Sequence, residues 1–255
     1  MKQHQQKVAL VTGAAKRIGR TIALALAGDG WDVAVHYGRS EREAQEVVAE
    51  IQRMGRRAIA VQCDLMDEQA VQGLFAKAEA LGPVACVVNS AALFDHDAAG
   101  DFSWQKLDAH MHTNLAAPLL LARALHAATA DGACSVVINL LDQKLYNPNP
   151  DFLSYTLSKA ALHSATTLLA QAFAPKVRVV GVALGLTMIS HMQSDEQFAA
   201  THSLSPLGES SRPEEVADAV LFAVKNRALT GSTILVDAGQ HLMPMSRDFS
   251  FIKRD

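Results

Sequence analysis

Tyr155 and Lys159 are four residues apart in a segment with helical periodicity, so both side chains project from one face of the expected helix. A phenol with a pKa of about 10 is a poor acid or base at neutral pH, and a nearby ammonium group lowers that pKa toward the working range. Such pairs occur by chance in many helices, but this one follows a predicted strand at 135–140. Tyr146 is the nearest alternative, and it has Pro150 rather than a lysine four residues later. The spacing therefore predicts acid–base chemistry at Tyr155.

A glycine-containing turn lies near the amino end, between a predicted strand at 7–12 and a predicted helix that begins at Ile18. Gly13 permits a tight turn, and Gly19 lets the helix pack close to the sheet. The amino terminus of such a helix offers free N–H groups to a pyrophosphate. A packed turn without a ligand is the alternative, because two glycines alone are weak evidence. The order of strand, turn and helix favours a dinucleotide site.

The end of the second predicted strand, residues 36–40, indicates which dinucleotide binds. An NAD site places a carboxylate there, on the ribose 2′-hydroxyl, and this segment contains none. Arg39 offers a forked guanidinium, while Ser40, His36 and Lys16 add donors, a set that suits a 2′-phosphate. The alternative is that Arg39 and Ser40 are solvated residues that cap the next helix. We predict a preference for NADPH over NADH.

Strands and helices alternate along the whole chain. The strand segments are rich in Val, Ile and Ala and are apolar continuously, which is typical of parallel strands covered on both faces. This pattern predicts a doubly wound, Rossmann-type α/β fold, a seven-stranded parallel sheet with helices on both faces and a ligand site beyond the carboxyl ends of the strands. The predicted strands are 7–12, 32–37, 58–63, 84–89, 135–140, 177–183 and 232–237. The predicted helices are 18–28, 41–54, 68–80, 104–129, 152–173 and 213–224.

The length of 255 residues predicts a single domain, 1–255. We expect a cofactor half at about 7–140 and a catalytic and substrate half at about 141–255. The long segment between the sixth and last strands, 185–211, is expected to form a lid over the site.

Composition excludes several classes of protein. The net charge of −3 does not indicate the excess of basic residues that is typical of proteins that bind nucleic acid or an anionic membrane. The three cysteines are odd in number and far apart, which fits neither a disulfide framework nor a zinc site. The apolar run near the amino end is too short for a signal or a spanning helix. We therefore expect a cytoplasmic protein with no metal, no membrane contact and no nucleic-acid partner.

Together these motifs resemble the short-chain dehydrogenase/reductase family over essentially the full length of the chain. The resemblance implies that Tyr155 is the proton donor, that Lys159 tunes it and holds the nicotinamide ribose, and that Asn114 anchors a water in a proton relay. Asp64 either accepts a bond from the adenine amino group or caps the following helix. The residues that carry the resemblance are the turn 12–19, Asp64, Asn89, Ser90, Ala91, Asn114, Tyr155, Lys159 and the closing segment 237–240.

Asp142 departs from the common family pattern, which has a serine 13 residues before the tyrosine. An ionised carboxylate can only accept hydrogen bonds. About 4 Å from developing negative charge it would cost about 4 kcal/mol at an effective dielectric constant near 20, roughly three orders of magnitude in rate. Asp142 therefore argues against simple carbonyl reduction and favours reduction of a C=N bond in a nitrogen heterocycle. The alternative is a carboxylate that caps the strand end or pairs with Lys144.

Phe94 is a second departure, and it would supply an aromatic face that stacks a flat ring against the nicotinamide. The alternative is a core aromatic under the lid. With Arg17 in the turn, the stretch 36–40 and Asp142, it resembles the pteridine reductase branch, which includes dihydromonapterin reductases. This resemblance implies that Arg17 reaches the cofactor phosphates and the substrate. It further implies reduction of a dihydropterin, such as dihydromonapterin or dihydrofolate, to the tetrahydro form.

The expected site follows from the residues and the resemblance together. We expect the catalytic residues Asn114, Asp142, Tyr155 and Lys159, and the substrate-binding residues Arg17, Phe94, Asp142 and Tyr155. We expect NADPH to be bound by Gly13, Lys16, Arg17, Ile18, Gly19, His36, Tyr37, Arg39, Ser40, Asp64, Leu65, Asn89, Ser90, Ala91, Tyr155, Lys159 and Gly185.

Two other functions remain open at this stage. One is an NADPH-dependent carbonyl, quinone or acyl-carrier thioester reductase of the same family. The other is a non-catalytic NADPH-binding scaffold, although nothing obliges a mere binder to keep Tyr155, Lys159 and Asn114. The family also implies a homotetramer built partly on the uncharged helix 152–173. The tail 248–252 either reaches a neighbour's site or docks on its own subunit.

Overall fold

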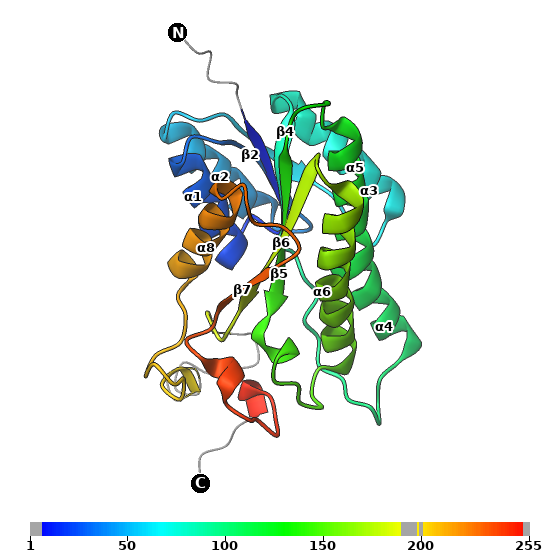
Figure 1. Ribbon diagram of the computed structural model, residues 1–255, viewed down its shortest axis with the longest axis vertical. Coiled ribbons are helices and arrows are strands. Elements are labelled where there is room, and N and C mark those ends of the chain that lie inside the picture. Colours follow the sequence, from blue (N-terminus) through cyan, green and yellow to red (C-terminus); the bar gives the residue numbers. More distant parts are fainter. Residues whose placement is uncertain (1–6, 190–197, 199–200, 252–255) are drawn as a thin grey trace.

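The computed structural model describes residues 7–189, 198 and 201–251. Its strands form one parallel sheet in the order β3-β2-β1-β4-β5-β6-β7 (Figure 1). The predicted doubly wound fold with a seven-stranded parallel sheet is therefore confirmed. The strands are β1 (Val8–Val11), β2 (Asp32–Tyr37), β3 (Ala58–Gln62), β4 (Val84–Asn89), β5 (Ser135–Asp142), β6 (Val177–Leu184) and β7 (Thr233–Val236).

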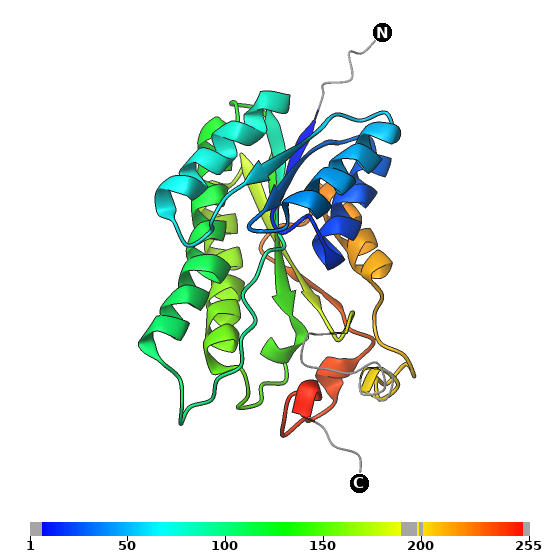
Figure 2. The same ribbon diagram turned by 180° about the vertical axis from the view of Figure 1, so that it is seen from behind.

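Helices cover both faces of this sheet. In Figure 1, α1, α2 and α8 lie on one side of the strands and α3, α4, α5 and α6 lie on the other, and Figure 2 shows the same layers from behind. Within the described residues, no helix combines the length and the apolar character that crossing a membrane requires. The helices are α1 (Arg17–Gly28), α2 (Glu41–Arg53), α3 (Glu68–Ala78), α4 (Trp104–Met111), α5 (Ala117–Ala128), α6 (Leu153–Phe173) and α8 (Pro213–Lys225). The short helical segments are η1 (Glu79–Leu81), η2 (His112–Ala116), η3 (Gln143–Leu145), η4 (Gln240–Leu242) and η5 (Phe249–Phe251).

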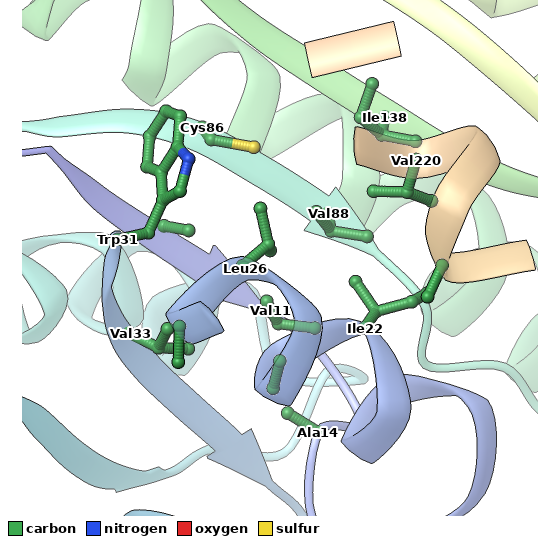
Figure 3. Packing of buried hydrophobic residues seen from close by; sticks show 14 of the residues in the cluster. Val11, Ala14, Ile22, Leu26, Trp31, Val33, Cys86, Val88, Ile138 and Val220 are labelled. Carbon is green, nitrogen blue, oxygen red and sulfur yellow. The ribbon is translucent and has the colours of Figure 1, made fainter. Parts of the chain in front are cut away.

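The core on the α1 face explains why the strands read as continuously apolar. Ile22 and Leu26 lie one helical turn apart on α1 and pack with Val11 and Val88 from neighbouring strands (Figure 3). Val220 from α8 closes the same cluster. Because α3, α5 and α6 cover the opposite face, residues of β1 through β6 are buried there too. Burying each Leu, Ile or Val contributes roughly 1.5–3 kcal/mol, so both helical layers hold the strand ends in place.

The predicted helix 104–129 is interrupted in the structure. It consists of α4, the π-helical turn η2 and α5. Pro118, in the first turn of α5, has no N–H to donate to the carbonyl group of Asn114, four residues earlier. The regular α-helical ladder is therefore broken next to Asn114, a place where π-turns frequently serve functional sites.

Two strands are longer than predicted, and the difference matters for the site. β5 ends at Asp142 and β6 ends at Leu184, and these two residues pair in register. Asp142 is thus the last residue of a central strand rather than part of a loop. The segment that contains η4 and η5 lies beyond the carboxyl ends of the strands (Figure 1).

Candidate active site

Gly13 and Gly19 bring the first turn close to its neighbours. Gly13 has a φ of +64°, and a Cβ atom on it would lie 2.9 Å from the Cα atom of Ala91. A Cβ atom on Gly19 would clash with the Gly13 carbonyl oxygen. The turn therefore requires glycine at both positions, and it leaves room for a ligand to approach the backbone.

The amino terminus of α1 is suited to an anion. Lys16 occupies the N-cap position, and its side chain makes no capping hydrogen bond. The first N–H groups of the helix, including that of Ile18, thus keep their donors for a ligand. Arg17 adopts a left-handed backbone with a φ of +54°. These features fit the pyrophosphate of a dinucleotide.

His36 holds the turn in place. The Gly13 N–H donates to His36 Nδ1 (3.0 Å), and His36 Nε2 lies 3.1 Å from the carbonyl oxygen of Cys63. Because Nδ1 accepts, Nε2 carries the hydrogen and donates. Burial lowers the pKa of His36, which favours this neutral form. Both ring nitrogens are engaged within the protein, so its expected donation to a 2′-phosphate is replaced in this structure by bracing of the turn.

Of the remaining 2′-phosphate candidates, Arg39 and Ser40 follow β2 and Lys16 directly precedes α1. Ser40 is the N-cap residue of α2, but its side chain makes no capping hydrogen bond, so the hydroxyl group is not used as a cap. Arg39 is exposed, and its guanidinium forms no ion pair or hydrogen bond with the described residues. Lys16 forms an ion pair with Glu43 (3.1 Å). Tyr37 is half-buried and packs against the core.

Asp64 and Leu65 follow β3. Asp64 Oδ1 accepts a hydrogen bond from the N–H of Met66 (3.0 Å). Asp67, rather than Asp64, caps α3 by accepting from the N–H of Ala70. The second carboxylate oxygen of Asp64 is therefore left for another donor, as the adenine interpretation requires. Leu65 is buried in the core below it.

Asn89 belongs to a buried polar chain that sequence reasoning missed. Its Nδ2 donates to Asn139 Oδ1 (2.8 Å), and Asn139 Nδ2 donates to Thr166 Oγ1 (3.0 Å). The backbone N–H groups of Ser90 and Ala91 donate to the hydroxyl group of Thr12, the residue that follows β1. The chain ties β4, β5 and α6 together, while Asn89 Oδ1 is buried without a partner.

Asp142 and Tyr155 form the centre of the candidate site. The Tyr155 hydroxyl group donates to Asp142 Oδ2 (2.8 Å), and the N–H of Lys144 donates to Asp142 Oδ1 (2.8 Å). Lys159 Nζ donates to the carbonyl oxygen of Leu140 (2.7 Å) and lies 5.8 Å from the Tyr155 ring centroid. Asp142 therefore caps η3, as the alternative proposed, and also contacts Tyr155.

The electrostatics of this group differ from the expectation for Tyr155. Burial, and then the neighbouring Asp142 carboxylate, raise the pKa of Tyr155 well above its ordinary value. Burial also raises the pKa of Asp142 and lowers that of Lys159 to about 8. The effect of Asp142 on the pKa of Tyr155 is therefore larger than that of the Lys159 ammonium group, which donates its hydrogen bond to the backbone. Tyr155 therefore keeps its proton, which its hydroxyl group shares with Asp142 Oδ2 in a hydrogen bond, and it can act as an acid.

Asn114 is fixed by the π-turn η2. Its Oδ1 accepts from the N–H of Leu93 (2.8 Å), and its Nδ2 donates to the Leu93 carbonyl oxygen and to Ser158 Oγ (both 3.0 Å). These bonds hold the segment after β4 against α6. The anchoring of a water by Asn114 stays a prediction.

Phe94 lies beside Tyr155. Its ring stacks on Phe152, with centroids 4.2 Å apart and planes at 13°, and meets the Tyr155 ring edge-on at 4.7 Å. Phe152 is fully buried and was not foreseen. It supports Phe94 from one side, so the two rings form a rigid aromatic platform next to the acid pair.

A cavity of about 700 Å³ connects the turn with the acid pair. Arg17 reaches across it, with Nη2 3.5 Å from the carbonyl oxygen of Met188. Residues 190–197 and 199–200 of the predicted lid lie outside the described residues. Twelve predicted site residues line the cavity: Gly13, Lys16, Arg17, Ile18, Gly19, Ser90, Ala91, Phe94, Asp142, Tyr155, Lys159 and Gly185. The predicted residues that do not line it are His36, Tyr37, Arg39, Ser40, Asp64, Leu65, Asn89 and Asn114.

The C-terminal tail supplies lining residues that were not predicted as part of the site, namely Asp248, Phe249 and Ser250. Of the two alternatives for the tail, the structure has it docked on its own subunit through 248–251. No group of three His, Cys, Asp or Glu residues in the described part of the chain is arranged to hold a metal ion.

The chain is similar to known proteins over nearly its whole length. Residues 13–241 match the family described as enoyl-(acyl carrier protein) reductase. L-rhamnose 1-dehydrogenase (NAD(P)(+)) of Sphingomonas sp. is 31% identical over 95% of this chain and 99% of its own. The 3-oxoacyl-[acyl-carrier-protein] reductase FabG of Staphylococcus aureus is 30% identical, over 92% and 98%. The crystal structure of FolM alternative dihydrofolate reductase 1 from Brucella canis complexed with NADP is 38% identical, with a TM-score of 0.91 over 96% of this chain and 97% of that one.

Proposed function

The chain belongs to the short-chain dehydrogenase/reductase family, and we propose that it is an NADPH-dependent reductase of a pterin-type heterocycle. The substrate would be a dihydropterin, such as dihydromonapterin or dihydrofolate, reduced to the tetrahydro form. The observation that carries the proposal is the hydrogen bond of Tyr155 to Asp142 (2.8 Å) beside the Phe94 ring. The similarity to the Brucella canis alternative dihydrofolate reductase supports the same substrate class.

The acid pair suits reduction of a C=N bond. Such a reduction adds a hydride to the ring carbon and a proton to the ring nitrogen, so that one C–H and one N–H bond replace the double bond. The raised pKa of Tyr155 keeps its proton in place at neutral pH. Tyr155 would donate it, and Asp142 would hold the hydroxyl group in position and accept ring N–H donors. No oxyanion forms, so a carboxylate at this place carries no penalty of the kind expected for carbonyl reduction.

The residues present fit NADPH. When bound, NADPH supplies the hydride. The amino terminus of α1 would hold the pyrophosphate, and Arg39 and Ser40 would hold the 2′-phosphate. Lys159 would bind the nicotinamide ribose with the ammonium hydrogens that Leu140 does not use. Phe94 would stack on the substrate ring, and Arg17 would reach both ligands from the edge of the cavity.

Exchange of Asp142 for the serine usual in the family tests the proposal. In the wild type, NADPH consumption with dihydrofolate or a dihydropterin should exceed that with ketones or quinones. Asp142→Ser should lower kcat/KM for the dihydropterin by about 10²-fold or more, because the carboxylate that positions the Tyr155 hydroxyl group and accepts ring N–H donors is lost. It should leave the carbonyl rates equal or higher. Unchanged dihydropterin reduction in Asp142→Ser would contradict the assigned role.

Carbonyl reduction is the second candidate function, and the relatives favour it. L-rhamnose 1-dehydrogenase and FabG are named for carbohydrate and acyl-carrier substrates. Turnover of a ketone, quinone or thioester alone, with no dihydropterin activity, would support this candidate. In that case Asp142 would work as a neutral hydrogen-bond donor.

We also expect a homotetramer. Leu157 and Leu168 on α6 are 47% and 63% exposed, and Trp104 at the start of α4 is 81% exposed. Apolar side chains on one helical layer favour burial against a second copy. Light scattering should give the mass of four chains, and a monomer at micromolar concentration would contradict this expectation.

A further inference from the structure

The C-terminal segment forms one wall of the candidate active site. Asp248 and Phe249 line the cavity together with Asp142 and Tyr155. The segment, red in Figure 1 and Figure 2, lies beyond the carboxyl end of β5. Phe249 is 8% exposed, so the segment is packed against the rest of the protein at this residue. The Asp248 side chain on this wall therefore faces any ligand that binds in the cavity.

Asp151, two residues before the start of α6, anchors the segment. Its carboxylate accepts hydrogen bonds from Arg247 Nε and from the N–H of Asp248, both at 2.8 Å. Arg247 in turn lies over the Phe251 ring, 5.1 Å from its centroid, and Phe251 packs against His96 at 4.7 Å. Asp151 is 4% exposed, and such buried, charge-assisted bonds are geometrically specific. The backbone on both sides of the Asp248 side chain is therefore held.

Lys144 joins the two carboxylates of the cavity. Its Nζ donates to Asp248 Oδ2 (3.2 Å) and to the carbonyl oxygen of Asp151 (2.6 Å), and its backbone N–H donates to Asp142 Oδ1 (2.8 Å). Asp248 Oδ1 accepts from the N–H of Ser250 (3.0 Å). Lys144 is only 2% exposed, whereas the Asp248 side chain is 15% exposed, toward the cavity that it lines. Each oxygen of Asp248 keeps a second lone pair for a ligand donor.

We propose that Asp248 is a substrate-binding residue that, together with Asp142, selects planar heterocycles carrying N–H donors over carbonyl compounds of similar size. The inference rests on the proposed function and names the feature of the substrate that the site recognises. Two carboxylates on different elements accept from adjacent ring or amino N–H groups, while Phe94 provides the stacking face. A ligand without such donors leaves Asp248 with no partner in the cavity. Burial is the largest cause of the raised pKa of Asp142 and Tyr155, and the charge of Asp248 adds a smaller contribution to both, which agrees with their sharing one cavity.

Ligand binding to the NADP⁺-loaded full chain tests this inference without turnover. Diaminopteridine is the probe with N–H donors, and naphthoquinone is a flat bicyclic ligand without them. Asp248→Asn should weaken diaminopteridine binding about 10- to 100-fold, because a charge-assisted hydrogen bond is lost. Naphthoquinone binding and NADPH affinity should change less than about threefold, within the effect of a neutral surface change. Ser246→Ala, an exposed position on the same stretch of chain, serves as the matched control and should change neither.

The outcomes separate this inference from the proposed function. Unchanged diaminopteridine binding in Asp248→Asn, equal weakening of both ligands, or no binding of the probe by the wild type would each overturn the role of Asp248. Selective weakening of the probe in Asp248→Asn, in a wild type that reduces no dihydropterin, would support the inference and contradict the proposed function. Dihydropterin reduction with an unchanged KM in Asp248→Asn would support the proposed function and contradict the inference.

Discussion

Arg17 combines a strained backbone with a functional side chain, and two substitutions separate these effects. Its φ of +54° lies in the left-handed region, where a side chain costs roughly 1–2 kcal/mol. Arg17→Gly removes the strain, whereas Arg17→Ala keeps it. Glycine also makes the unfolded chain more flexible, which offsets roughly 0.5–1 kcal/mol. We therefore expect Arg17→Gly to be more stable than Arg17→Ala by roughly 0.5–1 kcal/mol, or about 1–4 °C in Tm.

Both variants lose the guanidinium group, so they should be equally poor enzymes. We expect kcat/KM for a dihydropterin to fall about 10- to 100-fold in each, as for loss of a charged hydrogen-bond donor. Thermal unfolding and steady-state kinetics on the same preparations provide the two readouts. Equal Tm values for Arg17→Gly and Arg17→Ala would refute the strain argument. Activity restored by glycine but not by alanine would refute the side-chain role, because the backbone alone would then account for function.

Three further predictions concern the acid pair and its lysine. Tyr155→Phe should lower turnover by about 10²–10⁴-fold while NADPH affinity, measured by fluorescence, stays within about threefold; unchanged turnover would remove Tyr155 from the mechanism. Burial lowers the pKa of Lys159 to about 8, so NADPH affinity should weaken as pH rises through this value, and a titration of Lys159→Met should lack that dependence. Burial raises the pKa of Asp142, so its protonated form stabilises the fold at low pH and this contribution is lost as pH rises through the folded-state pKa. Asp142→Asn should therefore raise Tm at neutral pH by about 2 °C or more and change it little in acid, and the opposite pH trend would contradict the shift.

The strand segments were predictable because burial on both faces of a parallel sheet requires continuous apolar runs, and the helix of Tyr155 and Lys159 because its spacing is local. The π-turn at Asn114 was missed, although Pro118 was a readable signal that the predicted helix 104–129 is interrupted. For these elements, the local residue pattern and the backbone chemistry of proline are sufficient to predict the structure.

Contacts between distant positions account for what the sequence could not reveal. His36 braces Gly13, 23 residues earlier in the chain, and Asp151 holds Asp248, 97 residues later. Such pairings depend on the folded arrangement and leave no periodic pattern. The raised pKa of Tyr155 likewise depends on the direction in which its hydroxyl group and Lys159 Nζ point, which spacing alone does not specify.

Substrate preference of the wild-type protein tests the central claim most directly. Loss of NADPH absorbance would be measured with dihydromonapterin, dihydrobiopterin and dihydrofolate, with matched ketones and quinones, and again with NADH. The acid pair of Asp142 and Tyr155 predicts turnover of the pterin or folate compounds with NADPH, and little with the carbonyl compounds or with NADH. Turnover of the carbonyl compounds alone would contradict the account, because an ionised Asp142 disfavours developing negative charge on oxygen.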